Sequence, residues 1–357
     1  MPARLQPSEA RIKVSAITAD AITPSSRFRV RQHTQALADY GIDVTEHLPL
    51  IGKNATLPGF LGRARPAAVV PILAPFIAAK VLARVPGVIC SYRSDLTWLQ
   101  RELVNAAYTF EGLLKRPVIF DVDDAIWLTR QFIPRIAGQV DCVIAGNSFI
   151  ADWFSRHCAD VHVIPTAVDT DRFAPASQCR AAEYFAVGWT GSSSTLKYLL
   201  ALEPALARFL AVAPRAELRV LCDRRPEFRI IPPDRVRYYS WTPQNEASTV
   251  AAFDVGLMPL EDVDWSRGKC SFKMLQYMAV GIPTVVSPVG MNQEILRMAE
   301  VGIGARSDDD WTQSLLALYA DKALGCRMGR AGRLLACERF AVPVVSHQLA
   351  ALFKSYA

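Results

Sequence analysis

Short apolar runs rich in β-branched residues alternate with longer stretches of helical character along this chain, and the alternation restarts once. Continuous apolar runs are typical of strands that are covered on both faces in a parallel sheet. Their alternation with helices predicts two doubly wound α/β domains, one for each series. The expected strands are 12–17, 87–91, 117–121, 142–146 and 161–165 in the first series and 184–189, 217–222, 236–239, 255–258 and 284–287 in the second, and the expected helices include 29–40, 96–114, 195–213, 271–280 and 293–299.

A polar, proline-containing passage, residues 170–180, separates the two series and has the composition of a linker. The length of 357 residues also exceeds what one ordinary open sheet requires. We therefore expect a first domain at 1–172, a second at 173–340 and a terminal helix at 341–357. Because parallel sheets bind ligands at the carboxyl ends of their strands, we expect the site in a cleft between the domains.

Composition limits the classes of function. The chain has 40 basic and 34 acidic residues, a net charge of +6 that suits diphosphates or acidic lipids and is too diffuse to indicate nucleic acid. The 8 cysteines include no CxxC pair and no histidine at the spacing of zinc ligands, which favours reduced thiols in a cytosolic protein. No apolar leader follows Met1, so we do not expect export.

The most apolar stretch, residues 67–83, contains prolines and a lysine and is shorter than the roughly 20 residues that span a bilayer. We do not expect it to cross a membrane. Because Arg63, Arg65 and Arg84 flank it, it could lie on an anionic membrane surface. The alternative is an ordinary helix that packs on a sheet.

Residues 254–290 read as strand, loop, helix, turn and strand, and they carry the strongest indication of a binding site. Lys269, Lys273 and Gln276 form one stripe of the helix. Lysines at a helix N-terminus face its partial positive charge and are stabilised by an anion. With Arg267 and the neighbouring backbone N–H groups they would form a diphosphate cradle. The alternative is a solvated basic face.

A second candidate turn follows the first strand of the second series, in the sequence Gly188-Trp189-Thr190-Gly191-Ser192. Its small residues permit close backbone approach to a phosphate or a sugar. The turn has neither the GxGxxG nor the Walker spacing, and a plain helix-capping loop would have the same composition.

Together these motifs resemble glycosyltransferase family 4, the retaining GT-B enzymes often associated with cell-wall biosynthesis. The segment 267–294, RGKCSFKMLQYMAVGIPTVVSPVGMNQE, is similar to a subgroup pattern, GKxxFKxLQYMAxGxPVVxSxVGxNxE. Further matches are FDVDDAIW at 120–127, AGNS at 145–148, VIPTAVD at 163–169 and VGWTGS at 187–192.

The resemblance implies two Rossmann-like domains facing a cleft, with the terminal helix packing back on the first domain. A nucleotide-diphosphate sugar, such as a UDP- or GDP-sugar, would bind the second domain, and a glycan, lipid-linked or other hydroxyl acceptor would bind the first. The sugar would keep its anomeric configuration, usually without a bound metal or cofactor. The implied location is cytoplasmic, with peripheral association at the inner face of the membrane left open.

Two departures from the family concern the donor. The family's paired glutamates, separated by seven residues, correspond here to Gly268 and Gln276. Gln276 can hydrogen-bond ribose hydroxyls, but Gly268 has no side chain, so we nominate Glu294 instead. Trp189 stands where an arginine is frequent, and Lys197 would supply the lost charge with the two lysines of the cradle.

A third departure lies in the first domain, where Asp123-Asp124 replaces the family's His-Asp pair. Asp123 could orient the sugar or the acceptor hydroxyl or act as a base, and the alternative is a local helix-cap or loop-ordering role. Arg27 and Arg29 could meet an acidic acceptor or be solvated. We therefore expect Asp123 and Lys273 to be catalytic, and Arg27, Arg29 and Asp124 to bind the acceptor.

In this hypothesis Arg267, Lys269, Lys273 and nearby backbone amides stabilise the charge that develops on the departing diphosphate. Two other functions stay open: a non-catalytic nucleotide-sugar-binding or partner-activating protein on the same fold, and an epimerase that acts on the nucleotide sugar. The expected donor-binding residues are Gly188, Trp189, Thr190, Gly191, Ser192, Lys197, Arg267, Gly268, Lys269, Gln276 and Glu294, with no metal ligands.

Overall fold

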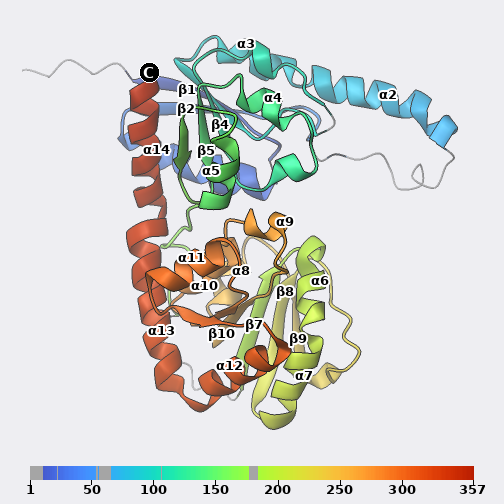
Figure 1. The fold of residues 1–357 in the computed structure, drawn as a ribbon, viewed down its shortest axis with the longest axis vertical. Helices are drawn as coiled ribbons and strands as arrows, with labels where there is room; N and C mark the ends of the chain where they lie inside the picture. Colours follow the sequence, from blue (N-terminus) through green and yellow to red (C-terminus); the bar gives the residue numbers. More distant parts are fainter. Residues whose placement is uncertain (1–10, 22, 54, 56–65, 106, 177–183) are drawn as a thin grey trace, which may run out of the picture. The chain divides into compact units, whose positions relative to one another are not determined.

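The computed structural model describes residues 11–21, 23–53, 55, 66–105, 107–176 and 184–357, with the backbone alone at 66–73. The chain divides into two compact units (Figure 1). Unit 1 comprises Met1–Thr166 and Val345–Ala357, and unit 2 comprises Ala167–Val344. Arg63, Arg65 and the second part of the expected linker lie outside the described residues.

The sheet of unit 1 is parallel throughout, with the strand order β2-β1-β3-β4-β5-β6. Every residue of β3, β4 and β5 is buried, as expected for strands covered on both faces. The strand order reverses at β1, and open α/β sheets bind ligands at the carboxyl ends of strands beside such a reversal. The strands are β1 (Ile12–Ile17), β2 (Ile42–His47), β3 (Leu96–Gln100), β4 (Val118–Val122), β5 (Cys142–Ala145) and β6 (Val161–Val163).

Most helices of unit 1 are short, and α2 differs from the others. No residue between 74 and 83 is buried, and Figure 1 shows α2 extending away from the sheet. The alternative that this stretch is an ordinary helix packed on the sheet is therefore wrong for these residues. The helices are η1 (Ser26–Val30), η2 (Arg31–His33), α1 (Thr34–Asp39), α2 (Pro66–Leu82), α3 (Val85–Ser91), η4 (Glu111–Leu113), η5 (Ile126–Leu128), α4 (Ile133–Ala137) and α5 (Ser148–Phe154).

The last helix, α14 (Val342–Tyr356), belongs to unit 1 from Val345 onward. The ring of Phe353 packs edge-to-face on Trp98, with the ring centroids 5.0 Å apart. The His33 Nδ1 atom lies 2.7 Å from the Ser346 hydroxyl, and both residues are buried. These contacts make α14 part of the core of unit 1.

The sheet of unit 2 is also parallel, with the order β12-β11-β10-β7-β8-β9. Here the order reverses at β7, which places the carboxyl ends of β7 and β10 at the position favoured for ligand binding. The prediction of two doubly wound α/β domains is thereby confirmed. The strands are β7 (Phe185–Gly191), β8 (Ala216–Cys222), β9 (Val236–Ser240), β10 (Val255–Met258), β11 (Thr284–Val286) and β12 (Gly302–Gly304).

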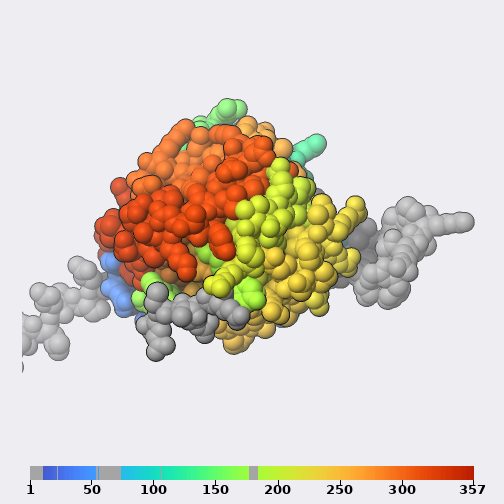
Figure 2. All heavy atoms as spheres, turned by 90° about the horizontal axis from the view of Figure 1, so that it is seen from below, coloured from blue at the N-terminus to red at the C-terminus, as the bar shows by residue number. Residues whose placement is uncertain are grey.

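Helices on both faces complete unit 2. Figure 2 shows the orange-red atoms of α12 against the yellow-green atoms of α7, where Phe209 meets Tyr319 edge-to-face at 6.0 Å and Arg208 pairs with Asp309 at 2.9 Å. The helices are η6 (Ser193–Thr195), α6 (Leu196–Ala201), α7 (Glu203–Val212), η7 (Pro233–Arg235), α8 (Glu246–Val250), α9 (Asp264–Arg267), α10 (Phe272–Ala279), α11 (Met291–Met298), α12 (Asp308–Ala320), α13 (Lys322–Leu335) and η8 (Ala336–Phe340).

Two assignments made from the sequence are wrong. The expected strand 87–91 is helix α3, which has Pro86 in its first turn, a position that favours helix initiation. The expected helix 96–114 begins instead as β3, because pairing with β1 and β4 buries all five of its residues. Tertiary burial overrode the local pattern there. The short strands β2 and β12 were not predicted.

Candidate functional site

The loops after β10 and β11 of unit 2 approach each other closely at a glycine. Gly290, the N-cap of α11, has φ +53°, and a Cβ built on it would lie 2.6 Å from the Arg267 carbonyl oxygen. Only glycine fits this backbone conformation and this contact without strain. The start of α11 is thus held against the end of α9.

A hydrogen-bonded chain joins the starts of α10 and α11. Ser271, which precedes α10 with φ +50°, donates its hydroxyl to Asn292 Oδ1 at 2.7 Å, and Asn292 Nδ2 donates to the Ser287 carbonyl at 3.0 Å. The side chain of Ser271, the N-cap of α10, makes no capping hydrogen bond, and the N-cap of α11, Gly290, has no side chain. The N-terminal ends of the two helices, which carry partial positive charge, therefore lie next to each other.

Two half-buried lysines accompany these helix starts. Lys273 Nζ lies 5.8 Å from the centre of the Trp189 ring, and Lys269 Nζ lies 5.2 Å from that of Trp265. We call the N-terminal ends of α10 and α11, with Lys269 and Lys273, the anion cradle. Arg267 lies beside it, exposed, and pairs with Asp262 at 2.9 Å and Asp264 at 3.1 Å. These carboxylates already offset much of its charge.

The turn after β7 divides into an interior and an exposed part. Gly188 and Trp189 are buried, and a Cβ on Gly188 would lie 1.9 Å from the Phe253 ring. Both residues thus pack inside unit 2, and their contact with a donor stays a prediction. Thr190 is buried too, and its N–H donates to the Tyr277 hydroxyl at 3.1 Å.

Gly191 and Ser192 remain accessible at the end of β7. A Cβ on Gly191 would lie 2.9 Å from Lys273 Cε, so this glycine borders the anion cradle directly. Lys197 is exposed on α6, with its Nζ 4.8 Å from the centre of the Tyr198 ring.

The positions that correspond to the family's two glutamates lie inside unit 2. Gly268 is buried as the C-cap of α9. Gln276 is buried, and its Nε2 donates to Glu246 Oε1 at 2.9 Å. Glu246 in turn pairs with Arg172 at 2.9 Å, and the sequence analysis missed it. Glu294 is half-buried in the first turn of α11.

In unit 1, charged side chains gather just after β3 and β4. Arg101, at φ +57°, places its Nε 2.6 Å from Asp123 Oδ1 and also pairs with Asp124. Burial opposes ionisation of Asp123, but the Arg101 guanidinium prevails and holds the pKa of that carboxyl below its usual range. An ionised carboxylate of low pKa accepts hydrogen bonds well and is a weak proton acceptor. The geometry favours an orienting role over the base role.

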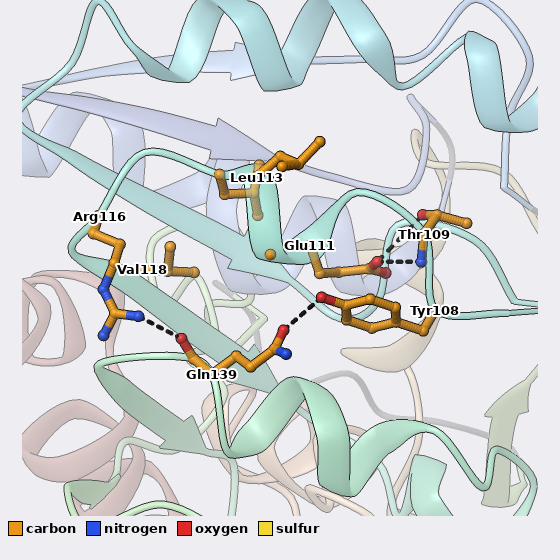
Figure 3. A pocket seen from close by; sticks show the side chains of 9 residues that line it. Tyr108, Thr109, Glu111, Leu113, Arg116, Val118 and Gln139 are labelled. Atoms are coloured by element: carbon orange, nitrogen blue, oxygen red, sulfur yellow. Dashed lines mark hydrogen bonds between the residues drawn. The ribbon is translucent and has the colours of Figure 1, made fainter.

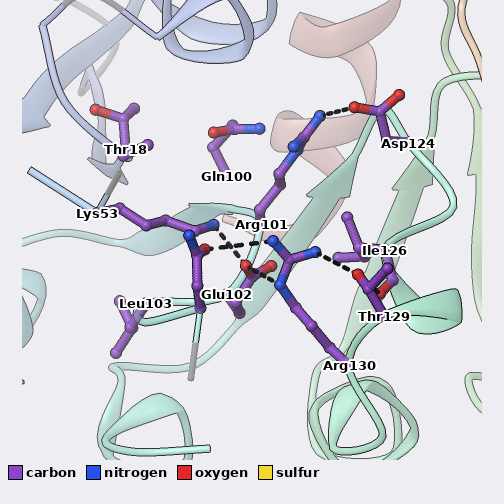
Figure 4. A network of polar contacts seen from close by, with 12 residues as sticks. Thr18, Lys53, Gln100, Arg101, Glu102, Leu103, Asp124, Ile126, Thr129 and Arg130 are labelled. Carbon is purple, nitrogen blue, oxygen red and sulfur yellow. Dashed lines mark hydrogen bonds and ion pairs between the residues drawn. The ribbon is translucent and has the colours of Figure 1, made fainter. Parts of the chain in front are cut away.

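A second charged group adjoins the first (Figure 4). Glu102 Oε1 lies 2.8 Å from both Lys53 Nζ and Arg130 Nε. Burial lowers the pKa of Lys53 to about 8, although Glu102 opposes that shift. We call the six side chains the ion cluster: Lys53, Arg101, Glu102, Arg130, Asp123 and Asp124.

The sequence analysis missed four members of the ion cluster. Its signal was present, because Arg101 and Glu102 directly follow the apolar run 96–100. The assignment of that run to a helix concealed it.

The two arginines proposed for the acceptor have different environments. Arg29 is buried, with its Nε 2.8 Å from Asp121 Oδ1 and its Nη1 donating to the Ile164 carbonyl at 2.9 Å. Its guanidinium thus joins β4 to the end of β6, which favours a structural role, and its contact with an acceptor stays a prediction. Arg27 is half-buried, 4.9 Å from the centre of the Phe28 ring.

A hollow of about 450 Å³ lies elsewhere in unit 1, beside the start of β4 (Figure 3). Its polar groups bond one another: Tyr108 donates to Gln139 Oε1 at 2.5 Å, and Arg116 donates to the Gln139 carbonyl at 2.9 Å. It lies at the opposite end of β4 from Asp123, and we assign it no part in the site.

Comparisons with known proteins bear on unit 2 first. Residues 184–321 match the model of a family described as "Glycosyl transferases group 1". A search of curated proteins with this sequence finds no match.

Solved structures are similar over nearly the whole chain. Sucrose-phosphate synthase from Thermosynechococcus elongatus has a TM-score of 0.68 and 16% identity over 97% of this chain and 99% of that one. Anabaena HepE, in complex with UDP and glucose, has a TM-score of 0.69 and 15% identity over 97% of this chain and 100% of that one. WaaG, a glycosyltransferase involved in lipopolysaccharide biosynthesis, has a TM-score of 0.65 and 12% identity over 96% of this chain and 99% of that one. The chain therefore has the GT-B fold, and its second unit carries the domain of the group 1 glycosyl transferases.

Proposed function

We propose that this protein is a retaining glycosyltransferase that moves a sugar from a UDP- or GDP-sugar to a glycan, lipid-linked or other hydroxyl acceptor in polysaccharide or cell-envelope biosynthesis. The observation that carries the proposal is the anion cradle, with two helix starts held together by Ser271 and Asn292 and two lysines beside them. Support also comes from the family match of unit 2 and from the UDP bound to HepE.

The cradle supplies the chemistry that this reaction needs at the leaving group. When the bond between the sugar and the diphosphate breaks, negative charge grows on the diphosphate. Lys273, Lys269 and the partial positive charge at the N-terminal ends of α10 and α11 would stabilise that charge without moving, because the fold already holds them. Donor binding and leaving-group stabilisation without a metal are thus assigned to unit 2.

The ion cluster is assigned to the acceptor. Asp123 and Asp124 are exposed by 13% and 22% of their side chains, enough to accept a hydrogen bond from an acceptor hydroxyl. Arg101 holds the pKa of Asp123 below its usual range and pairs with both carboxylates, so Asp123 would orient the hydroxyl that attacks the sugar.

Donor binding can be measured by the shift in melting temperature with UDP, GDP and their sugars, with chelator and again with magnesium. We expect one nucleotide sugar to raise the melting temperature of the protein in chelator, because a ligand that binds only the folded state stabilises it. Lys273→Ala should weaken this binding and reduce turnover by about 10²–10³-fold, as the loss of one transition-state contact typically does.

Lys322→Ala, on α13 and away from the cradle, is the matched control and should behave as the wild type. Wild-type turnover and donor affinity in Lys273→Ala would refute the role of the cradle.

A specific observation supports a second function, a non-catalytic nucleotide-sugar-binding protein. Gly268 offers no carboxylate, and Gln276 is buried against Glu246. Such a protein would bind the donor and give no product with any acceptor. Hydrolysis or transfer of the sugar, detected as released nucleoside diphosphate, would exclude it.

We also propose peripheral association with an anionic membrane at the cytoplasmic face. The window Ala74–Ser91 has the length and apolar composition of a membrane-spanning helix, and 17% of it is buried. Leu82 and Ile89 are 64% and 60% exposed, and exposed Arg93 lies just beyond them. Because α3 is packed on unit 1 through Val88, we favour a helix lying on the surface over a spanning one.

Flotation with anionic vesicles tests the association. The double variant Leu82→Asp/Ile89→Asp should lose vesicle binding, whereas Leu334→Asp, an equally exposed leucine on α13, should keep it. Equal flotation of both variants would argue against the proposal.

A further inference from the structure

A cysteine, an aspartate and a histidine meet on one face of the unit 1 sheet, at the strand pair β5·β6. Register pairs Val143 with Val161 and Ile144 with His162. Because side chains alternate along a strand, His162 points to the same face as Cys142, and Asp160 lies opposite Cys142. The Cys142 Sγ atom, an Asp160 carboxylate oxygen and an imidazole nitrogen of His162 lie within 4.8 Å of one another.

Neighbouring groups hold the aspartate in place. Its Oδ1 lies 2.8 Å from His162 Nε2, and its Oδ2 accepts the hydroxyl of Tyr356 from the last turn of α14. The Cys158 thiol donates to the Asp160 carbonyl at 3.3 Å. The carboxylate therefore has a fixed direction, with Tyr356 as an outer support.

The three groups differ in exposure in a way that suits an ion arriving from solvent. Cys142 is buried, whereas the side chains of Asp160 and His162 are 44% and 45% exposed. A buried sulfur beneath two accessible ligands leaves room for water as a fourth ligand. Cysteine, histidine and aspartate are the side chains that bind zinc, and three of them with one water form a complete tetrahedral set.

We propose that Cys142, Asp160 and His162 bind a zinc ion. On binding, the Cys142 thiol releases its proton to solvent and the sulfur bonds to the metal. The ion would fix Asp160 and, through it, Tyr356, so that α14 is tied to β5 and β6. Since Cys142 begins β5 while Asp123 follows the end of β4, the site is separate from the ion cluster.

The test uses the full chain, without an affinity tag and with its thiols reduced. Zinc is titrated by calorimetry, and cobalt(II) is titrated by absorption, because cobalt bound to a thiolate gives a strong charge-transfer band. We expect one equivalent of either ion and a cobalt band that Cys142→Ser abolishes. His162→Gln should abolish tight zinc binding, and Tyr356→Phe should weaken it by about 10–100-fold, as loss of an outer-shell partner typically does.

Two controls separate this site from other cysteines. Cys326→Ser removes an exposed thiol of unit 2, and Cys158→Ser removes the neighbouring thiol of unit 1. Both should keep the cobalt band. A band that persists in Cys142→Ser, or no band in the wild type, would overturn the proposal.

Because Cys142 is buried and its serine variant could unfold, His162→Gln provides the second test at an exposed position. Unchanged zinc affinity in that folded variant would also overturn the proposal. Neither readout depends on sugar transfer, so the result is independent of the proposed function.

Discussion

The anion cradle and the ion cluster are built in opposite ways. The cradle takes its groups from one segment, 267–294, and relies on two helix N-termini, glycine contacts and lysines that stay partly accessible. The ion cluster takes its six side chains from four separate segments of unit 1 and neutralises three buried or half-buried cations with three carboxylates. Because the parts of the cradle are neighbours along the chain, they form a recognisable sequence motif. The charges of the ion cluster come from separate segments and form none.

The comparison predicts that charge matters most for the stability of unit 1. Glu102→Gln should reduce the free energy of unfolding by about 3–5 kcal/mol, because Lys53 and Arg130 would lose their shared carboxylate in a buried position. Urea denaturation, with hydrogen exchange of the β3 amides as the probe, measures this loss of unfolding free energy. Glu300→Gln, at an exposed position, is the control. A loss below 1 kcal/mol would mean that the cluster is effectively solvated.

Close packing at glycine should matter most for unit 2. A Cβ on Gly256 would lie 2.2 Å from the Tyr277 ring, and hydrogen bonds of the Tyr277 hydroxyl to Thr190 and Leu257 hold that ring in place. Gly256→Ala should therefore destabilise unit 2 by about 1–3 kcal/mol in chemical denaturation.

Gly325→Ala provides the contrast within the same unit. Its Cβ would meet the nearest heavy atom at 3.5 Å, an ordinary contact in helix α13. We expect it to be neutral or to stabilise by roughly 0.5–1 kcal/mol, since alanine favours helix over glycine. Similar losses in both variants would contradict the packing explanation.

Acid should affect unit 1 through a buried histidine. Burial, and then the charge of Arg29, lower the pKa of His33 from 6.5 to about 3. The unfolded chain takes up a proton below 6.5 while the folded one does not, so this stability is present above pH 6.5 and is lost as the pH falls toward 3. One unit below 6.5 the loss is about 1.4 kcal/mol.

His33→Gln tests this pH dependence because glutamine does not titrate and can still hydrogen-bond Ser346. We expect the variant to show a flatter dependence of unfolding free energy on pH between 6.5 and 4. Equal slopes in the two proteins would show that His33 is already protonated or solvated in the folded state.

The smallest effect is expected at a helix cap of unit 2. The Ser307 side chain accepts the Asp310 N–H at 3.1 Å, and Asp310 accepts the Ser307 N–H at 2.9 Å, closing a capping box at α12. Ser307→Ala should lower the melting temperature through a loss of about 1 kcal/mol. Ser307→Asp keeps an acceptor at the cap and should restore most of it. Failure of this rescue would indicate a packing effect instead.

The fold was predictable from the sequence where a strand forms a short apolar run rich in β-branched residues. Strands β1 and β10 have the predicted bounds, and most others differ by one or two residues. β2 was missed because exposed polar residues alternate along it, as on a sheet edge. β3 was missed because its apolar run is followed by residues that can continue a helix, and only pairing with β1 and β4 decides its state.

The site was predictable only where its residues lie close together in the sequence. The lysines and the glycine-mediated contact of the cradle lie within one motif, and the structure brings them together. The burial of Gly188, Trp189 and Arg29 could not be predicted, because it depends on partners such as Phe253 and Asp121 that are distant in sequence. The zinc ligands were missed for the same reason, since sheet register and not spacing makes them neighbours.

Unit 1 is interrupted in the sequence by the whole of unit 2, and this has a consequence for biosynthesis. The strands of unit 1 leave the ribosome first, but Ser346 and Phe353, which cover His33 and Trp98, follow only after unit 2 has been translated. Domains generally fold as units in the order of synthesis. Here the first domain must wait, with part of its apolar core uncovered, until the second has emerged.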